Sequence, residues 1–187
     1  MLFRSSLFVA TRAVELDPLS PEASTWLGVQ LYLARRYEEA VAELRATLSS
    51  TPDFDYARLW LGRAYARMGR YPEAIDELER TQHTVKFGIA EYRSALARVY
   101  ADAGDVVAAR RMLDELQALS TREFVAPIFI ALVQIGLSDK DGALDSLTLA
   151  ADGHSYTVPW WPLDPELDPL RDDARFMALM KTVAIKH

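Results

Sequence analysis

Apolar residues recur every three or four positions along most of this chain, which is the spacing of one face of an α-helix. In residues 1–16 they fall at Phe3, Leu7, Ala10 and Val14. Similar segments follow, separated by short polar or glycine-containing turns such as Arg35-Arg36 and Gly69-Arg70. The pattern predicts an all-α chain built from consecutive amphipathic helices.

Capping residues define where several of these helices begin and end. Ser20 can accept a hydrogen bond from a free amide of the first turn, Pro21 loses no hydrogen bond there, and Glu22 suits the positive end of the helix dipole. This helix is expected to run to about Ala34. The next ones are expected over residues 37–50, 55–68 and 71–84, with Pro52 ending the first of them.

Small, aromatic and apolar residues return at a spacing of 34 positions. The pairs are Gly28 and Gly62, Tyr37 and Tyr71, Ala40 and Ala74, and Leu44 and Leu78. This period and pattern resemble the tetratricopeptide helix–turn–helix repeat. The resemblance implies a right-handed superhelix of stacked helix pairs with a concave groove. It also implies that the two glycines let paired helices approach, with Ala40 and Ala74 facing them.

Two further copies are weaker but recognisable. The third is offset by 35 residues, with Ala97, Gly104 and Leu113 at the positions of Gly62, Gly69 and Leu78, so the connection over residues 82–88 carries one extra residue. Ser120 and Glu123 resemble a capping box that opens the fourth pair. We therefore expect a half repeat in residues 1–19, four helix pairs in 20–152 and a closing segment in 153–187, all within a single solenoid domain.

The closing segment differs in composition from the repeats. Residues 152–173 contain four prolines and the pair Trp160-Trp161, which predicts an ordered loop with at least one tryptophan packed on the fourth pair. A last amphipathic helix from Asp172 would cap the solenoid. The stretch WPLDPELDPLRDDARF resembles the end of bacterial multidomain regulators that join a winged-helix or serine/threonine kinase domain to tetratricopeptide repeats, although Ala174 stands where those often carry proline.

Composition excludes several classes of protein. With 27 acidic and 21 basic residues the net charge is −6 and no basic patch is visible, which argues against direct nucleic-acid binding. The chain has no cysteine, which excludes disulfides and Cys-ligated zinc and fits a reducing compartment, so we expect a cytoplasmic protein. No apolar run approaches the ~18 residues of a membrane span, and no signal-peptide cleavage site follows the N-terminus.

No catalytic or cofactor-binding motif is visible. The histidines, at positions 83, 154 and 187, are too scattered to form a metal signature. A phosphate-binding glycine-rich loop, a nucleophile elbow and an HExxH motif are all absent from the sequence. We therefore predict a non-catalytic protein without metal or cofactor, whose partner is a protein or peptide.

In the tetratricopeptide family the first helix of each pair lines the groove. The resemblance then implies exposed groove residues at Thr25, Val29, Tyr32, Tyr56, Leu59, Trp60, Arg63, Arg67, Glu91, Ser94, Arg98 and Asp102. The three arginines can bind a carboxylate or phosphate on a peptide, or can be solvated arginines paired with nearby acidic residues. The subfamily that clamps chaperone tails uses asparagine and lysine here, whereas this chain has no asparagine and no lysine at these positions.

Two functions remain open at this point. The first is a protein-interaction scaffold or adaptor that binds a peptide or partner helix in the groove. The second is a regulatory or self-association segment of a longer kinase or transcription regulator, because Pro18 lies 34 residues before Pro52 and the chain thus begins inside a repeat. Leu2, Val9, Ala13 and Leu16 form a second apolar stripe that a preceding helix or a second copy would cover, as in a homodimer through this helix.

Overall fold

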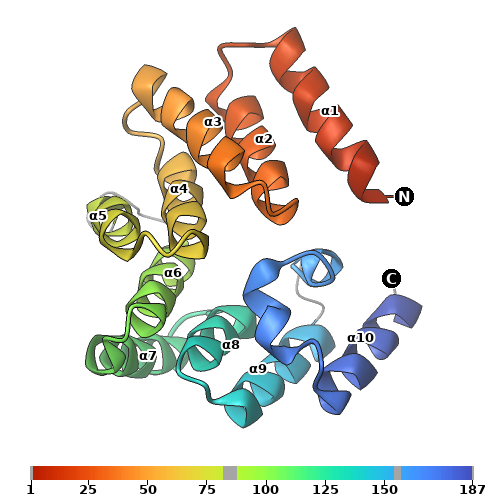
Figure 1. Ribbon diagram of the computed structural model, residues 1–187. Helices are drawn as coiled ribbons and strands as arrows, with labels where there is room; N and C mark the ends of the chain where they lie inside the picture. The colour runs from red at the N-terminus through yellow and green to blue at the C-terminus, as the bar shows by residue number, and fades with distance from the viewer. Residues whose placement is uncertain (1, 82–87, 154–156, 187) are drawn as a thin grey trace. The chain divides into compact units, whose positions relative to one another are not determined.

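The structure is a computed structural model that describes residues 2–81, 88–153 and 157–186, without the side chains of residues 2–5 and 184–186. Every regular element in these ranges is helical, as the sequence predicted (Figure 1). Residues outside the described ranges include 82–87 of the connection predicted over 82–88, and with them the last turn of the helix predicted to reach residue 84. His83, His154 and His187 also lie outside the described residues.

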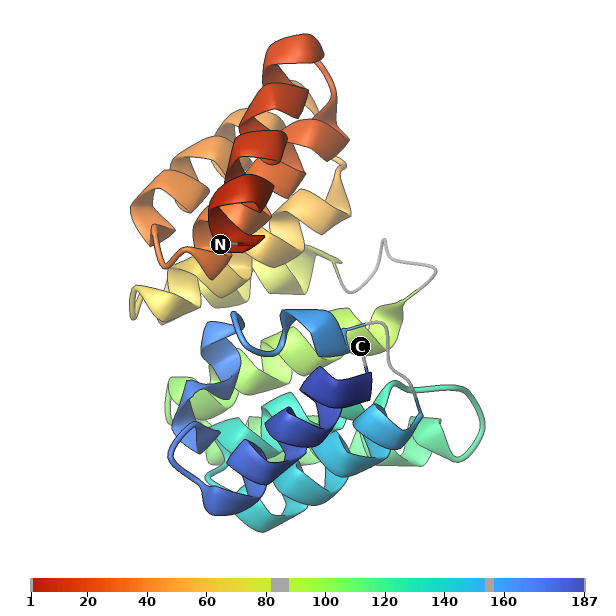
Figure 2. The ribbon, with the colours of Figure 1, turned by 90° about the vertical axis from the view of Figure 1, so that its right-hand side faces the viewer.

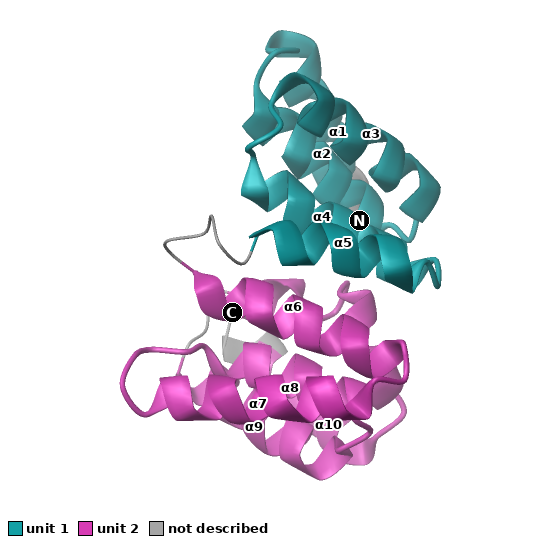
Figure 3. Ribbon diagram, turned by 90° about the vertical axis from the view of Figure 1, so that its left-hand side faces the viewer, with its two compact units in different colours: residues 1–87 teal, residues 88–187 magenta. Residues whose placement is uncertain are grey.

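Two compact units make up the chain, residues 1–87 and residues 88–187 (Figure 3). The first unit contains α1 (Leu2–Leu16), α2 (Pro21–Leu33), α3 (Tyr37–Ser50), α4 (Asp55–Arg67) and α5 (Tyr71–Thr81). Each helix packs on the next one along the chain, and α2 also packs directly on α4. The unit is therefore built from helix pairs with a shared core.

The second unit continues the same construction and adds the closing segment. It contains α6 (Ile89–Asp102), α7 (Val106–Ser120), α8 (Pro127–Gly136), α9 (Lys140–Asp152), η1 (Val158–Trp160), η2 (Pro165–Leu170) and α10 (Ala174–Lys186). Here α6 packs on both α7 and α8, while α10 lies along α9 (Figure 2). The 3-10 helix η2 packs on α8, so the closing segment folds back onto the repeat helices.

A left-handed residue forms the turn inside each helix pair. Arg35, Gly69, Gly104 and Ser138 have φ angles of 62°, 71°, 90° and 61°, and they are 34, 35 and 34 positions apart. Glycine reaches this conformation without a steric cost, as predicted for Gly69. The next helix of a pair begins with an aspartate cap in two cases, where Asp105 accepts from the Ala108 amide and Asp139 from the Gly142 amide.

Close contact within a pair explains the two helical glycines. A Cβ atom added at Gly28 would lie 2.6 Å from Cγ of Leu44, and one added at Gly62 would lie 2.6 Å from Cγ of Leu78. Both leucines are fully buried. These leucines are therefore the nearest side chains to the two glycines, and the backbone carbonyl of Ala74 also lies against Gly62, 3.2 Å from the added Cβ.

The predicted capping box of the fourth pair is wrong. Ser120 is the last residue of α7, and its hydroxyl donates to the Gln117 carbonyl at 2.7 Å. Helix α8 begins at Pro127, after an extended Ala126. Proline favours an extended conformation in the residue before it and is well tolerated in the first helical turn. Its position therefore sets the start of α8, and the serine belongs to the preceding helix.

The closing segment is more regular than the predicted loop. Pro159 and Pro165 occupy the first turns of η1 and η2, where they lose no internal hydrogen bond, whereas Pro162 lies in the turn between them and Pro169 lies inside η2. Trp161 is buried and its indole N–H donates to the Thr157 hydroxyl at 3.2 Å, whereas Trp160 is partly exposed. Phe176 and Val183 of α10 are also buried, so the segment adds its own apolar residues to the core.

Candidate partner-binding surfaces

Helices α2 and α4 carry a cluster of aromatic side chains in the first unit. The Trp60 ring lies edge-to-face with Tyr32, at a centroid distance of 5.2 Å, and with Tyr56, at 6.2 Å. The Arg63 guanidinium lies over the Trp60 ring, 4.7 Å from its centroid. Edge-to-face and cation–π arrangements are the favourable geometries for these groups. The sequence predicted these four residues as groove residues, and the structure brings them together.

Most of the predicted groove residues of this unit are not exposed. Tyr56 is 38% exposed and Arg67 is half-buried, but the others are buried, namely Thr25, Val29, Tyr32, Leu59, Trp60 and Arg63. The prediction of exposure was wrong for these six because α2 packs directly on α4. Helical spacing shows which residues share one face of α2 or α4. It does not show that part of this face is buried in the contact between the two helices.

The predicted groove residues of the second unit are also largely covered. Ser94 is buried and its hydroxyl donates to the Phe129 carbonyl at 2.7 Å. Arg98 is buried too, and its guanidinium pairs with Asp102 at 3.0 Å. Asp102 is half-buried, as is Glu91. The predicted exposure of Ser94 and Arg98 was therefore wrong.

The closing segment provides part of this cover. Arg98 donates to the backbone carbonyls of Leu132 on α8, at 3.2 Å, and Glu166 on η2, at 3.4 Å. The guanidinium thus links α6, α8 and η2. Arg98 is thus paired with a nearby acidic residue, as one of the two sequence alternatives expected, but it is a buried structural anchor and not a solvated side chain. No local sequence signal indicates that η2 returns to this helix.

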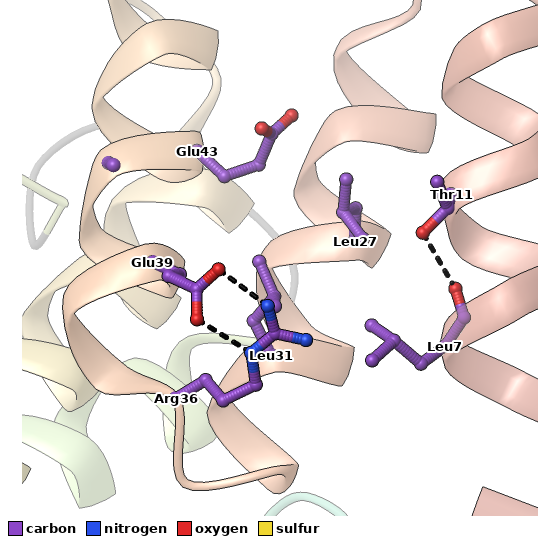
Figure 4. Close-up of a pocket in the computed structure, with 8 residues that line it drawn as sticks. Leu7, Thr11, Leu27, Leu31, Arg36, Glu39 and Glu43 are labelled. Carbon is purple, nitrogen blue, oxygen red and sulfur yellow. Dashed lines mark hydrogen bonds and ion pairs between the residues drawn. The ribbon is translucent and has the colours of Figure 1, made fainter. Parts of the chain in front are cut away.

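A pocket that the sequence analysis missed lies between α1, α2 and α3 (Figure 4). It has a volume of about 450 Å³ and is lined by Leu7, Thr11, Leu27, Leu31, Arg36, Glu39, Ala42 and Glu43. Arg36 donates two hydrogen bonds to Glu39, at 2.6 and 2.5 Å. These bonds lower the pKa of the Glu39 carboxyl below its usual value. The Glu43 carboxylate extends from α3 toward the pocket.

The described residues form neither a metal site nor a membrane-spanning helix. Within the described ranges, no group of three or more His, Asp or Glu side chains is arranged to hold a metal ion. None of the helices in residues 2–81, 88–153 and 157–186 has the length and apolar character that crossing a bilayer requires. The structural candidates are therefore the aromatic cluster and the α1–α3 pocket.

Comparison with known proteins identifies the repeats. Tetratricopeptide repeat family models match residues 3–53, 31–98 and 90–115, and no curated protein matches the sequence. A chain in the crystal structure of the APC/C hetero-tetramer Cut9-Hcn1 is similar in fold, with a TM-score of 0.63 and 16% sequence identity. The match covers 98% of this chain and 35% of that one, so this chain spans about a third of its length. Residues 3–115 are therefore tetratricopeptide repeats, and the chain has the all-α fold of a tetratricopeptide solenoid.

Proposed function

We propose that this protein is a non-catalytic interaction scaffold that binds a peptide or partner helix on the α4 face of its first unit. Tetratricopeptide repeats in general bind protein partners, because stacked helix pairs present extended surfaces. The observation that carries the proposal is the cluster of Trp60, Tyr56 and Arg63 on α4. Tryptophan, tyrosine and arginine are the residues most often found at the energetic centre of protein interfaces.

The geometry of the cluster favours binding at its exposed member, Tyr56. The Tyr56 ring is held against Trp60, which Tyr32 and Arg63 contact in turn, so Tyr56 needs little further ordering when a partner arrives, and ordering side chains is one of the main costs of association. Arg67 lies one helical turn after Arg63 on the same helix.

A comparison of variants tests this function. The full-length chain is used as bait in a lysate of the source organism, alongside a Tyr56→Ala, Arg67→Glu double variant. An Arg122→Glu variant serves as the matched control, because Arg122 is exposed outside α4. We expect a partner whose recovery falls at least tenfold in the double variant and is unchanged in the control.

The three baits must have the same helical content by circular dichroism before recovery is compared. If every retained protein binds the double variant as well as the wild type, the α4 face is not the binding surface. If a purified partner were identified, isothermal titration calorimetry would give the same ranking of the three chains, with a wild-type affinity of micromolar order, about −8 kcal/mol.

A second candidate function is self-association through α1. Phe8, Val9 and Leu16 are 71%, 60% and 73% exposed on this helix, and exposed apolar patches mark interaction sites. Leu2, which the sequence placed on the same stripe, has a side chain outside the described residues. The resemblance of the closing segment to bacterial kinases and transcription regulators also belongs to this candidate, in which the chain is a regulatory part of such a protein.

Sedimentation equilibrium distinguishes this candidate from the scaffold. A Val9→Glu, Leu16→Glu variant should be monomeric if α1 mediates a homodimer, whereas the wild type should be dimeric at micromolar concentration. Val107→Glu is the control, because Val107 is also an exposed apolar residue but lies on α7. A wild-type monomer up to several hundred micromolar would rule out self-association through α1.

A further inference from the structure

The α1–α3 pocket has a counterpart one repeat later, between α3, α4 and α5. Corresponding residues line both pockets at a spacing of 34 positions. Thr11 corresponds to Arg45, and Leu27 corresponds to Leu61. The shared carboxylate is Glu43 in the first pocket and Glu77 in the second. The second pocket therefore shows which kind of group pairs with the carboxylate at this repeat position.

An arginine of the chain itself occupies the second pocket. Arg58 of α4 forms an ion pair with Glu77 at 2.7 Å and donates to the Pro52 carbonyl at 2.5 Å. The side chains of Arg58 and Glu77 are only 13% and 17% exposed. A guanidinium that is charge-paired and largely shielded from water is held more firmly than a surface ion pair. The Glu77 carboxylate is thus satisfied from within the repeat.

The first pocket keeps the carboxylate but lacks this arginine. Ser24 stands 34 positions before Arg58 and is too short to reach across the pocket. The first pocket has a volume of about 450 Å³ and the second about 270 Å³. Arg36, the basic residue that lines the first pocket, donates two hydrogen bonds to Glu39. Across the described part of the chain, Glu43 forms no ion pair.

We propose that the α1–α3 pocket binds an arginine side chain of a protein partner, with Glu43 accepting hydrogen bonds from the guanidinium. Leu7, Leu27 and Leu31 would pack against the aliphatic part of that side chain. The surface consists of α1, α2 and α3 and uses none of the α4 residues of the proposed function. It is therefore a second interaction surface, and the chemistry that it recognises is a guanidinium flanked by apolar residues.

Nuclear magnetic resonance titration of the ¹⁵N-labelled full chain tests the pocket directly. The probe is the peptide acetyl-Leu-Arg-amide, and its neutral counterpart is acetyl-Leu-citrulline-amide, which has nearly the same shape without the charge. We expect saturable shifts at the amides of Thr11, Leu27 and Glu43 with the arginine peptide, and at least tenfold weaker binding of the citrulline peptide. Equal binding of the two peptides, or no saturable shift, would overturn the proposal.

Three variants locate the binding more narrowly. Ser24→Arg places the missing arginine where Arg58 stands in the next repeat, so it should fill the pocket and abolish peptide binding. Glu43→Gln should also abolish binding, whereas Glu38→Gln, an equal charge change on α3 outside the pocket, should leave it unchanged. Unaltered binding by Ser24→Arg in a fully helical protein would contradict the proposal.

The same titration separates this proposal from the scaffold function. The Tyr56→Ala, Arg67→Glu variant should bind the arginine peptide as the wild type does, because neither residue lines the α1–α3 pocket. Loss of peptide binding in that variant would place the peptide on the α4 face and overturn the assignment of the pocket.

Discussion

Single residues at equivalent repeat positions differ in ways that have energetic consequences. The left-handed turn residue is glycine in two repeats but Arg35 and Ser138 in the other two. The buried residue after Val29 is Gln30, whereas 34 positions later it is Ala64, also buried. Neither side-chain polar atom of Gln30 has a hydrogen-bond partner among the described residues. Ser138 and Gln30 each lead to a stability prediction.

Ser138→Gly should stabilise the protein by about 1 kcal/mol, because glycine adopts a positive φ without the steric cost that serine has there. The gain is partly offset by the greater freedom of glycine in the unfolded chain. Urea denaturation measures the change. The mirror substitution, Gly104→Ser, should lower the free energy of unfolding by a similar amount, and a loss of stability in Ser138→Gly would contradict the explanation.

Gln30→Leu should raise the free energy of unfolding by roughly 1–3 kcal/mol, because it removes a buried amide that lacks hydrogen bonds. Gln134→Leu is the control. Gln134 is also buried, but its side-chain oxygen accepts a hydrogen bond from Ser146 at 2.8 Å, so its replacement should destabilise. Thermal denaturation of both variants gives the sign of the change in stability. A lower stability of Gln30→Leu would show that the Gln30 amide is hydrogen-bonded in the native protein.

At the scale of elements, the sequence predicts helices well and their termini less well. Apolar spacing together with Ser20 and Pro21 correctly predicts α2, because both signals are local. The start of α8 was mistaken because Ser120 and Glu123 match a capping pattern while Pro127 determines the helix start. The contact of η2 with α8 involves residues far apart in the sequence, so no local pattern could predict it.

Arg98→Leu tests the anchoring of η2. It removes a buried ion pair and the hydrogen bonds to Leu132 and Glu166, so the second unit should lose roughly 3–5 kcal/mol. Hydrogen exchange followed by mass spectrometry should show faster exchange in residues 165–171. Arg110→Leu, an exposed change on α7, is the control. Unchanged protection of η2 in Arg98→Leu would mean that other contacts hold this segment.

For the whole molecule, the sequence correctly predicts the all-α tetratricopeptide solenoid, because the 34-residue period reflects one helix pair per repeat. The repeat boundaries at residues 19 and 152 and the single-domain organisation stay predictions. Among the predicted groove residues, Tyr56, Trp60 and Arg63 do lie together. Helical spacing could not predict that neighbouring helices and η2 bury most of the predicted groove residues. The α1–α3 pocket becomes recognisable in the sequence only when Ser24 is compared with Arg58.

The central claim is that α4 of the first unit contacts a protein partner, and site-specific photo-crosslinking tests it most directly. Tyr56 is replaced by benzoylphenylalanine, the protein is irradiated in a lysate of the source organism, and the adducts are identified by mass spectrometry. Val107 on α7 carries the crosslinker in the control. We expect an adduct with one protein at position 56 that is absent at position 107. Identical adducts at the two positions, or none at position 56, would contradict the claim.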